Sequence, residues 1–436
     1  MQWESCRSRT SGHKPTFTRA ANAHEKRYHG GTGRGQAVPH RDQRQAPETA
    51  APRAAGPLSV SDAARAVVCQ PLLETLRLGS AAWDRLLERS PAASPFASWA
   101  WHWAWAHSAP PDDLNASYAV LLHGAGGVLE ALLPVAVRRV TFRRREVTAL
   151  TWAIGELGCP DHLDVLALPE ADLAAVVPAL KALSWDVVFL SNLAAEAPNA
   201  LQLGAALTRH GCAVRREALW TSPYVELPSS WEEYLASLSP TRRQGIRRAE
   251  RVLKRDHSVV VTDYSTERLE EGWRHLVALH EQRWAGAGTF SDPRVEQLHR
   301  CFTEEVARRQ QLWLTTLDVD GEPAAAWYGF ADRDTVYFYQ SGRDPRRAHQ
   351  SVGVVLMASM IRRAIERGYR RFDFLRGDEA YKTRWTTSQR CTFELVAFRP
   401  GWGGQWLRGL DAVGRLGDRL LPRNPSERVR SEPARA

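Results

Sequence analysis

The sequence predicts an α/β fold with two similarly built halves, on three observations. Helix-like and strand-like segments alternate along most of the chain. Each half holds an antiparallel hairpin, a helix and later strands in about the same order, although the halves share little residue identity. The chain has 436 residues, enough for two or three ordinary domains. An internal duplication is therefore a hypothesis that rests on the order of elements alone.

The first half is predicted over 57–221. SPFASWAWHWAWAHS carries aromatic residues at helical spacing, which more often fill a core than line a sugar-binding groove. Strands are expected at ASYAVLLHG and LEALLPVAVRRV, joined by a Gly-Ala-Gly-Gly turn. DHLDVLAL and WDVVFLSNL are expected as buried strands around a helix over 171–183. The helix NALQLGAALTRHG is expected to end at Gly211.

The second half is predicted over 222–400. It opens with SPYVELP, a helical stretch and the strand VVVTDYS, followed by two amphipathic helices with apolar residues three and four apart. Three strands then follow in LWLTTLDVDGEPAAAWYGFADRDTVYFYQSG, with turns at Asp320-Gly321 and between Asp332 and Asp334. A helix over 352–367 and the strands RRFDFL and TFELVAFR complete this half.

The net charge of +9 lies in the predicted tails. Residues 1–56 carry ten Lys/Arg and four Asp/Glu, and residues 401–436, predicted as a basic C-terminal tail, are also rich in arginine. The intervening core is close to neutral, so the charge says little about the folded domains. We expect the N-terminal 56 residues to be a disordered tail, and we expect no nucleic-acid partner.

The cysteine pattern and the N-terminus favour a cytoplasmic protein. Six cysteines are scattered without a CxxC pair, which is typical neither of a metal knuckle nor of a dense disulfide scaffold. The first residues lack an apolar run of signal-peptide length. Cys159, Asp161, His162 and Asp164 lie close in sequence, but their loose spacing fits the polar end of a strand better than a metal site. We therefore expect no metal.

The start of the helix over 352–367 is predicted to bind an anion. A helix that begins directly after a strand and a basic turn offers unpaired backbone N–H groups. A glycine near its start lets the backbone approach a pyrophosphate, and arginines of the turn pair with phosphate oxygens. The alternative is an ordinary capped helix beside a solvated basic loop. The candidate cofactor-binding residues are Arg343, Arg346, Arg347, Gln350, Ser351, Val352, Gly353 and Val354.

Reactive side chains cluster after the next strand, in FDFLRGDEAYKTRW. Transfer of a group to a nucleophilic acceptor needs a base for the acceptor and an acid for the leaving group. Asp378 or Glu379 is the candidate base, Tyr381 the candidate acid, and Lys382 the candidate stabiliser of developing negative charge. The alternative is a structural network of these charges. Asp373 fits a structural or substrate-positioning role better than that of the base.

The segment HEQRW and the end of the reactive cluster supply candidate acceptor contacts. His280 and Trp284 lie four residues apart, on one face of a helix. The alternative places the tryptophan in the core and its neighbouring arginine in a surface pair. The candidate substrate-binding residues are Arg283, Trp284, Asp373, Arg376 and Trp385.

A basic segment over 241–255 has seven Lys/Arg and one Glu. Either it grips an anionic nucleotide-linked or phospholipid-linked substrate, or it makes peripheral contact with an acidic membrane surface, or it is a solvated helix face.

Three strings of the second half, RRFDFLRGDEAYKTRW, HEQRW and TRRQGIRRAERVLKR, resemble the CelD-like or BcsL-like acetyltransferases. These belong to the GNAT superfamily and are associated with cellulose and other exopolysaccharide biosynthesis. The architecture also resembles the FemABX peptidoglycan transferases, which are paired GNAT domains. The resemblance covers about residues 70–400 and is strongest over 222–400. Many relatives have Ser-Pro-Gly at the start of the cofactor helix, where this chain has Ser351-Val352-Gly353.

The resemblance implies tandem GNAT-like domains of α/β (α+β) class, each a mixed, mostly antiparallel sheet flanked by helices. It implies acetyl-CoA or another acyl-CoA as the cofactor, and a hydroxyl or amine of a polysaccharide or cell-envelope precursor as the acceptor. Direct transfer is favoured because no cysteine has an evident nucleophile context. Two alternatives stay open, a FemABX-like aminoacyl-tRNA-dependent transferase and a non-catalytic scaffold of an envelope polysaccharide complex.

Overall fold

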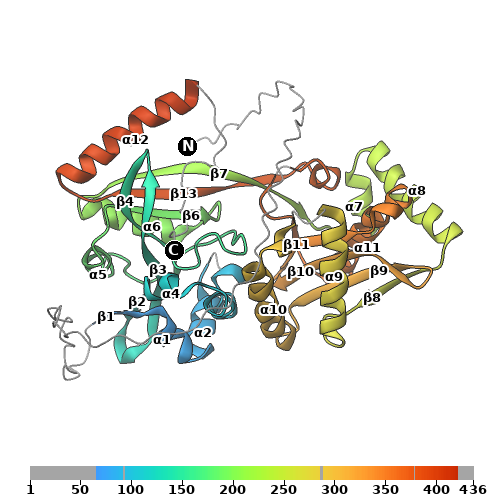
Figure 1. The fold of residues 1–436 in the computed structure, drawn as a ribbon, viewed down its shortest axis with the longest axis horizontal. Helices are drawn as coiled ribbons and strands as arrows, with labels where there is room; N and C mark the ends of the chain where they lie inside the picture. Colours follow the sequence, from blue (N-terminus) through green and yellow to red (C-terminus); the bar gives the residue numbers. More distant parts are fainter. Residues whose placement is uncertain (1–64, 92–93, 285–287, 378, 421–436) are drawn as a thin grey trace, which may run out of the picture. The chain divides into compact units, whose positions relative to one another are not determined.

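The computed structural model describes residues 65–91, 94–284, 288–377 and 379–420 (Figure 1). The tail expected over 1–56 lies outside the described residues. The region expected as a C-terminal tail is described up to residue 420, where it forms a long helix, α12 (Trp402–Leu420).

The first half alternates helices and strands as expected. Its elements are β1 (Ala66–Pro71), α1 (Leu72–Arg77), α2 (Ala81–Arg89), η1 (Pro95–Ala97), α3 (Trp99–Ala106), α4 (Pro111–Asn115), β2 (Ser117–His123), η2 (Ala125–Gly127), β3 (Leu129–Phe142), β4 (Arg145–Trp152), β5 (Leu166–Ala167), α5 (Val177–Ala182), β6 (Val187–Leu193), α6 (Pro198–Arg209) and β7 (Ala213–Glu226).

The second half repeats the alternation. Its elements are α7 (Trp231–Ser237), α8 (Pro240–Asp256), β8 (Val259–Asp263), α9 (Leu269–Trp284), η3 (Thr289–Ser291), α10 (Pro293–Arg308), β9 (Leu312–Val319), β10 (Glu322–Asp332), β11 (Thr335–Arg343), η4 (Pro345–Gln350), α11 (Val352–Glu366), β12 (Arg371–Asp373), η5 (Lys382–Arg384) and β13 (Gln389–Phe398).

The described strands join in one mixed sheet of 13 strands, which helices flank. Its order is β1-β2-β3-β4-β6-β13-β7-β12-β11-β10-β9-β8, with β5 beside β3. Neighbours pair antiparallel except for β4 with β6 and β11 with β12. The predicted fold class, a mixed and mostly antiparallel α/β architecture, is confirmed.

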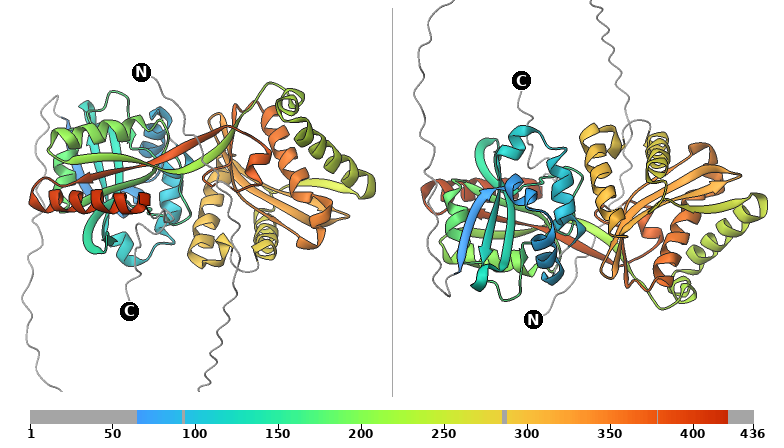
Figure 2. Two further views of the ribbon diagram at one scale, coloured as in Figure 1. Left: turned by 90° about the horizontal axis from the view of Figure 1, so that it is seen from above. Right: turned by 90° about the horizontal axis from the view of Figure 1, so that it is seen from below.

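The two halves show the same strand pairing and exchange their last strands. In each half four antiparallel strands lead to one parallel pair, β4–β6 in the first half and β11–β12 in the second. β7 then leaves the first half to pair with β12, and β13 returns from the second half to pair with β6. The two long strands run side by side between the halves (Figures 1 and 2). The expected boundary at 221/222 falls inside β7, and the division into separate domains stays a prediction.

The sheet of the second half is buried on both faces, as the alternation along β10 shows. Ala326, Tyr328 and Phe330 belong to the core cluster that includes α9 and α10. Ala325 and Trp327 point the other way, into the cluster that includes α11. Helices therefore cover both faces of this part of the sheet, since successive strand side chains alternate.

The tryptophan-rich segment forms a helix of the core, as the sequence predicts. In α3, Trp101 and Trp105 are buried, and Trp101 packs edge-on against Phe302 of α10 with 4.8 Å between the ring centroids. Burial of this aromatic surface joins the two halves in one continuous core cluster.

Two expected elements of the first half are shorter than predicted. The helix expected over 171–183 begins only at Val177, because Pro178 suits a first helical turn and restricts the residue before it. The strand expected at DHLDVLAL is reduced to β5. Asp164 there accepts hydrogen bonds from the backbone N–H groups of Asn199 and Ala200, so it caps the start of α6.

None of the described helices combines the length and the apolar character that crossing a membrane requires.

Two buried histidines predict acid sensitivity. Burial lowers the pKa of His102 to about 4 and that of His299 to about 3, so both are neutral in the folded protein. In the unfolded chain they take up protons near pH 6.5. The contribution of each histidine to stability is therefore complete above pH 6.5 and falls on acidification towards its folded pKa, by about 1.4 kcal/mol per pH unit.

Urea midpoints measured between pH 6.5 and pH 5 test this expectation. His299→Gln should flatten the dependence, because it removes one titrating group. An equal pH dependence of the midpoint in the variant and the parent would contradict the assignment.

Candidate active site

The strands β11 and β12 part at the centre of the second half. They pair in parallel over three positions, from Thr335 with Arg371 to Tyr337 with Asp373. Beyond this point β11 continues to Arg343, whereas the chain after β12 follows β7, where Phe374 N–H donates to the Pro223 carbonyl. The divergence opens the sheet on one side of β11.

A cavity of about 310 Å³ lies at the end of β11. Strands β10 and β11, the start of α11 and the segment around η5 form its walls. Its lining residues are Arg283, Ala325, Ala326, Trp327, Ser341, Gly342, Arg343, Ala348, Ser351, Val352, Gly353, Val354, Leu356, Met357, Tyr381, Arg384 and Trp385.

The N-terminus of α11 faces this cavity without a side-chain cap. Ser351 has a left-handed backbone conformation (φ 57°), and its carbonyl accepts from the N–H groups of Val354 and Val355. The first N–H groups of the helix, those of Val352 and Gly353, have no intrahelical partner. A Cβ at Gly353 would lie 3.8 Å from its nearest neighbour, Arg343 Cδ, so the backbone is open to a ligand. This end of the helix is suited to an anion.

Three arginines make the cavity electropositive. Arg283, Arg343 and Arg384 line it, and none of them forms an ion pair with a described carboxylate. Arg283 donates to Ser341 Oγ at 2.8 Å. Burial, and then the nearby charge of Arg343, lowers the pKa of Arg283. Unpaired cations held together in a partly buried site favour an anionic ligand.

Tyr381 is the predicted catalytic residue that the structure places in the cavity wall. Burial, reinforced by the charge of Glu379, raises the pKa of Tyr381, so its hydroxyl stays protonated. The Arg283 guanidinium lies 5.5 Å from the Tyr381 ring centroid. Among the described residues none hydrogen-bonds to this hydroxyl, which is therefore available to donate a proton.

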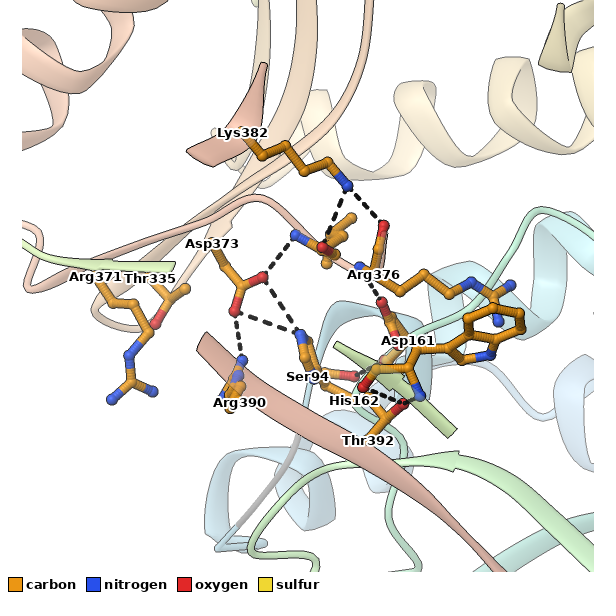
Figure 3. A network of polar contacts seen from close by, with 12 residues as sticks. Ser94, Asp161, His162, Thr335, Arg371, Asp373, Arg376, Lys382, Arg390 and Thr392 are labelled. Carbon is orange, nitrogen blue, oxygen red and sulfur yellow. Dashed lines mark hydrogen bonds and ion pairs between the residues drawn. The ribbon is translucent and has the colours of Figure 1, made fainter. Parts of the chain in front are cut away.

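Lys382 is directed away from the cavity. Its buried ammonium donates to the Arg376 carbonyl at 2.6 Å and to the Leu375 carbonyl at 3.4 Å, as Figure 3 shows. Glu379 completes the arrangement with an ion pair at 2.9 Å. Gly377 lies beneath this pair with a φ of 117°, and a Cβ there would collide with the Glu379 carboxylate. Lys382 thus holds the turn that carries Tyr381, and its predicted role in charge stabilisation stays a prediction. Asp378 lies outside the described residues.

Asp373 lies in a buried network that joins the two halves. It accepts hydrogen bonds from Arg390 Nη2 at 2.6 Å and Leu375 N–H at 2.7 Å, and His162 Nε2 lies 3.3 Å away (Figure 3). Burial alone would raise the pKa of Asp373, but His162, Arg390 and the Leu375 N–H together hold it well below its usual range. This carboxylate is saturated with partners, which fits the structural role that the sequence favours.

Arg376 also joins the halves. Its side chain pairs with Glu156 at 3.0 Å and donates to Asn192 Oδ1 at 2.9 Å. Its backbone N–H donates to Asp161 at 2.7 Å. Asp373 and Arg376 are therefore outside the cavity wall, and their predicted substrate contacts stay predictions.

Four predicted ligand residues, Arg346, Arg347, Gln350 and Trp284, are not among the residues that line the cavity. Arg346 is 86% exposed in its side chain and pairs with Asp344, while Arg347 donates to Gln350 Oε1. Gln350 contacts His257, and Trp284 is 45% exposed beside the Arg283 guanidinium. Four further predicted residues, Val352, Gly353, Val354 and Trp385, line the cavity itself.

Sequence reasoning missed the part of the wall that β10 and the end of β11 supply. A Cβ at Gly342 would collide with the backbone nitrogen of His280, so α9 packs directly on β11 at this glycine. His280 Nδ1 bonds with the Ser341 carbonyl in this contact, and its Nε2 accepts from the Thr289 N–H of η3. The Ser341-Gly342 pair before the basic turn is the feature of the sequence that could have indicated this part of the wall. The missed wall residues are Ala325, Ala326, Trp327, Ser341, Gly342, Ala348, Leu356, Met357 and Arg384.

Three of the four residues weighed as metal ligands have other partners. Asp161 accepts from Arg376, His162 contacts Asp373 and Asp164 caps α6. Within the described residues no three His, Cys, Asp or Glu side chains are grouped to hold a metal ion.

Comparison with known proteins identifies a domain in the second half. Residues 240–383 match the acetyltransferase (GNAT) domain family, so this part of the chain is a GNAT-type acetyltransferase domain. The matched range includes α8 to α11, β12 and Tyr381. No curated protein matches the chain in sequence.

Solved structures show distant similarity. FemX is 12% identical, with 71% of this chain and 94% of that one covered and a TM-score of 0.48. The C-terminal domain of a putative lysylphosphatidylglycerol synthetase from Agrobacterium fabrum is 12% identical, with 80% and 96% covered and a TM-score of 0.46. A tandem GNAT protein from the clavulanic acid biosynthesis pathway is 11% identical, with 78% and 100% covered and a TM-score of 0.41. Similarity at this level does not define a substrate.

Proposed function

We propose that the protein is an acyltransferase that uses acetyl-CoA or another acyl-CoA, bound in the cavity at the start of α11. The single observation that carries the proposal is an electropositive cavity against an uncapped helix N-terminus inside a GNAT-type domain. The bound cofactor would supply an acyl group activated as a thioester.

The residues present fit the pyrophosphate of CoA. The N–H groups of Val352 and Gly353 would bind its oxygens, because the helix start is uncapped and the glycine leaves room for close approach. Arg343 and Arg384 would neutralise its charge. Arg346, Arg347 and Gln350 in η4 would make further contacts with the cofactor.

Tyr381 would donate its proton to the sulfur atom of the departing thiolate, because its raised pKa keeps it protonated and it lies in the cavity wall. Asp378 or Glu379 would accept the proton of the acceptor. Glu379 is 51% exposed in its side chain, so water can relay the proton to it. Arg283 would stabilise negative charge that develops on the acyl oxygen.

The acceptor proposed is a hydroxyl or amine of a polysaccharide or cell-envelope precursor, attacked directly. Trp284 offers an exposed indole face beside Arg283 on which a sugar ring can stack. Mass spectrometry of the purified protein with acetyl-CoA and candidate acceptors tests the transfer. Retention of aminoacyl-tRNA without CoA, or absence of both CoA binding and product, would contradict the proposal.

Tyr381→Phe is expected to lower kcat by about a hundredfold or more while leaving CoA affinity near that of the parent, because only the proton donor is lost. Steady-state rates and calorimetric titration with CoA measure the two effects. Tyr369→Phe is the matched control, since Tyr369 packs against Trp313 and is not part of the cavity wall. Equal rates for both variants would remove Tyr381 from the mechanism.

A further inference from the structure

Helix α12 is fixed to the sheet by one face. Leu407 is 6% exposed, and Gly404 packs so closely that a Cβ there would collide with the Arg399 carbonyl oxygen. Asp411, 1% exposed, pairs with Arg215 of β7 at 2.7 Å and with Arg143 at 3.2 Å. These contacts set the rotation of the helix and so determine which residues face outward.

The outward face of α12 exposes an apolar stripe. Trp402 is 91% exposed, Trp406 51% and Val413 72%. Positions 402, 406, 409 and 413 recur at helical spacing, and the third of them is glycine, so no charge interrupts the stripe. The stripe lies on the side of the helix opposite Leu407 and Asp411. Large aromatic side chains this exposed are characteristic of an interaction surface.

Unpaired cations flank the stripe. Arg144 and Arg145 are exposed at the turn between β3 and β4, and the Arg145 guanidinium lies 5.5 Å from the Trp406 ring centroid. Arg408 of α12 does not belong to this side of the helix, because it lines another cavity together with Gly404 and Gly211. Neither Arg144 nor Arg145 forms an ion pair with a described carboxylate. The nearest acidic side chain in sequence, Glu146, accepts a hydrogen bond from Thr141.

We propose that this surface, formed by Trp402, Trp406, Val413, Arg144 and Arg145, docks on an anionic lipid bilayer. Indole rings partition to the headgroup region because one part of the ring is apolar and its N–H is polar. Arginines beside them are attracted to anionic headgroups. An amphipathic helix with this composition lies in the interface plane, and its inner face stays on the sheet. The proposal does not depend on the activity proposed above.

Flotation of the full chain with phosphatidylcholine vesicles, with and without phosphatidylglycerol, tests the docking. Binding is expected only with the anionic lipid and should weaken as salt is raised. Trp402→Ala with Trp406→Ala should lower the partition coefficient about tenfold. Arg144→Glu with Arg145→Glu should lower it at least about fivefold for each arginine.

Two matched variants serve as controls. Leu78→Ala removes an 82% exposed apolar side chain elsewhere and should leave binding unchanged. Arg247→Glu with Arg251→Glu changes two exposed cations of α8 and should also leave it unchanged. Thermal unfolding checks that every variant is folded.

The proposal is overturned if the parent does not float with anionic vesicles, or if the tryptophan variant floats equally well. It is also overturned if the α8 variant alone loses binding, which would place the membrane contact there. Light scattering after size-exclusion chromatography measures the mass of the parent and of the tryptophan variant in solution. A lower mass for the tryptophan variant than for the parent would make this face an interface between copies of the chain and would overturn the docking on lipid.

Discussion

Gly353→Trp is expected to abolish binding of CoA. The Kd should rise at least about a hundredfold, because the indole would fill the part of the cavity in which CoA is proposed to bind. The backbone at Gly353 faces the cavity, and the nearest side-chain atom, Arg343 Cδ, lies 3.8 Å from where a Cβ would be. An indole at this position must therefore extend into the space that the pyrophosphate needs. Calorimetric titration with CoA measures the loss.

Gly353→Ala is the matched control for this substitution. A methyl group at 3.8 Å makes an ordinary contact, and the residue has no left-handed backbone conformation, so the fold and most of the affinity should survive. Equal thermal stability of the two variants would show that the tryptophan acts on the ligand and not on folding. Unchanged affinity in the tryptophan variant would locate the cofactor elsewhere.

Asp373→Ala is expected to cost about 3–5 kcal/mol of folding free energy, because it leaves the charges of the network without their buried partner. Asp373 is 0% exposed and lies between Arg390 and His162, which come from different halves of the chain. Denaturant unfolding measures the change. The effect should fall on stability, since the side chain is not in the wall of the cavity.

Glu226→Gln provides the comparison for an exposed pair. Glu226 pairs with Arg371 one strand away, but its side chain is 59% exposed, so its loss should cost less than about 1 kcal/mol. A large loss of activity in a stable Asp373→Ala protein would contradict the structural role. It would show that this carboxylate takes part in substrate binding or catalysis.

The start of α11 was predicted correctly, because it depends on residues that are neighbours in the sequence. The features that could not be predicted depend on residues far apart in the sequence. Ser351 and Gly353 follow a strand and a basic turn, and their backbone chemistry depends on near neighbours. The environment of Asp373 depends on His162, which no local pattern connects with it. The direction of Lys382 depends on the turn at Gly377, which brings the ammonium back to carbonyls six and seven residues earlier.

The strands likewise fall into those that the local sequence predicts and those that it does not. The hairpins of the second half appear in the sequence because turn residues separate clear apolar runs. β1 escaped prediction because its burial pattern is that of a mostly exposed edge strand, and β4 because it begins with exposed charged residues. The placement of β13 beside β6 is not encoded near either strand, and only the complete sheet shows it.

The exchange of β7 and β13 has a consequence for how the chain folds as it is synthesised. Leu193 of β6 pairs with Phe393 of β13, which is synthesised about 200 residues later. Until then the ribosome carries a first half whose inner strand has an unprotected edge, ready to pair with another chain. Pairing over such a sequence separation is slow, because loop closure must precede it. The nascent protein therefore depends on protection of this edge from aggregation until β13 emerges.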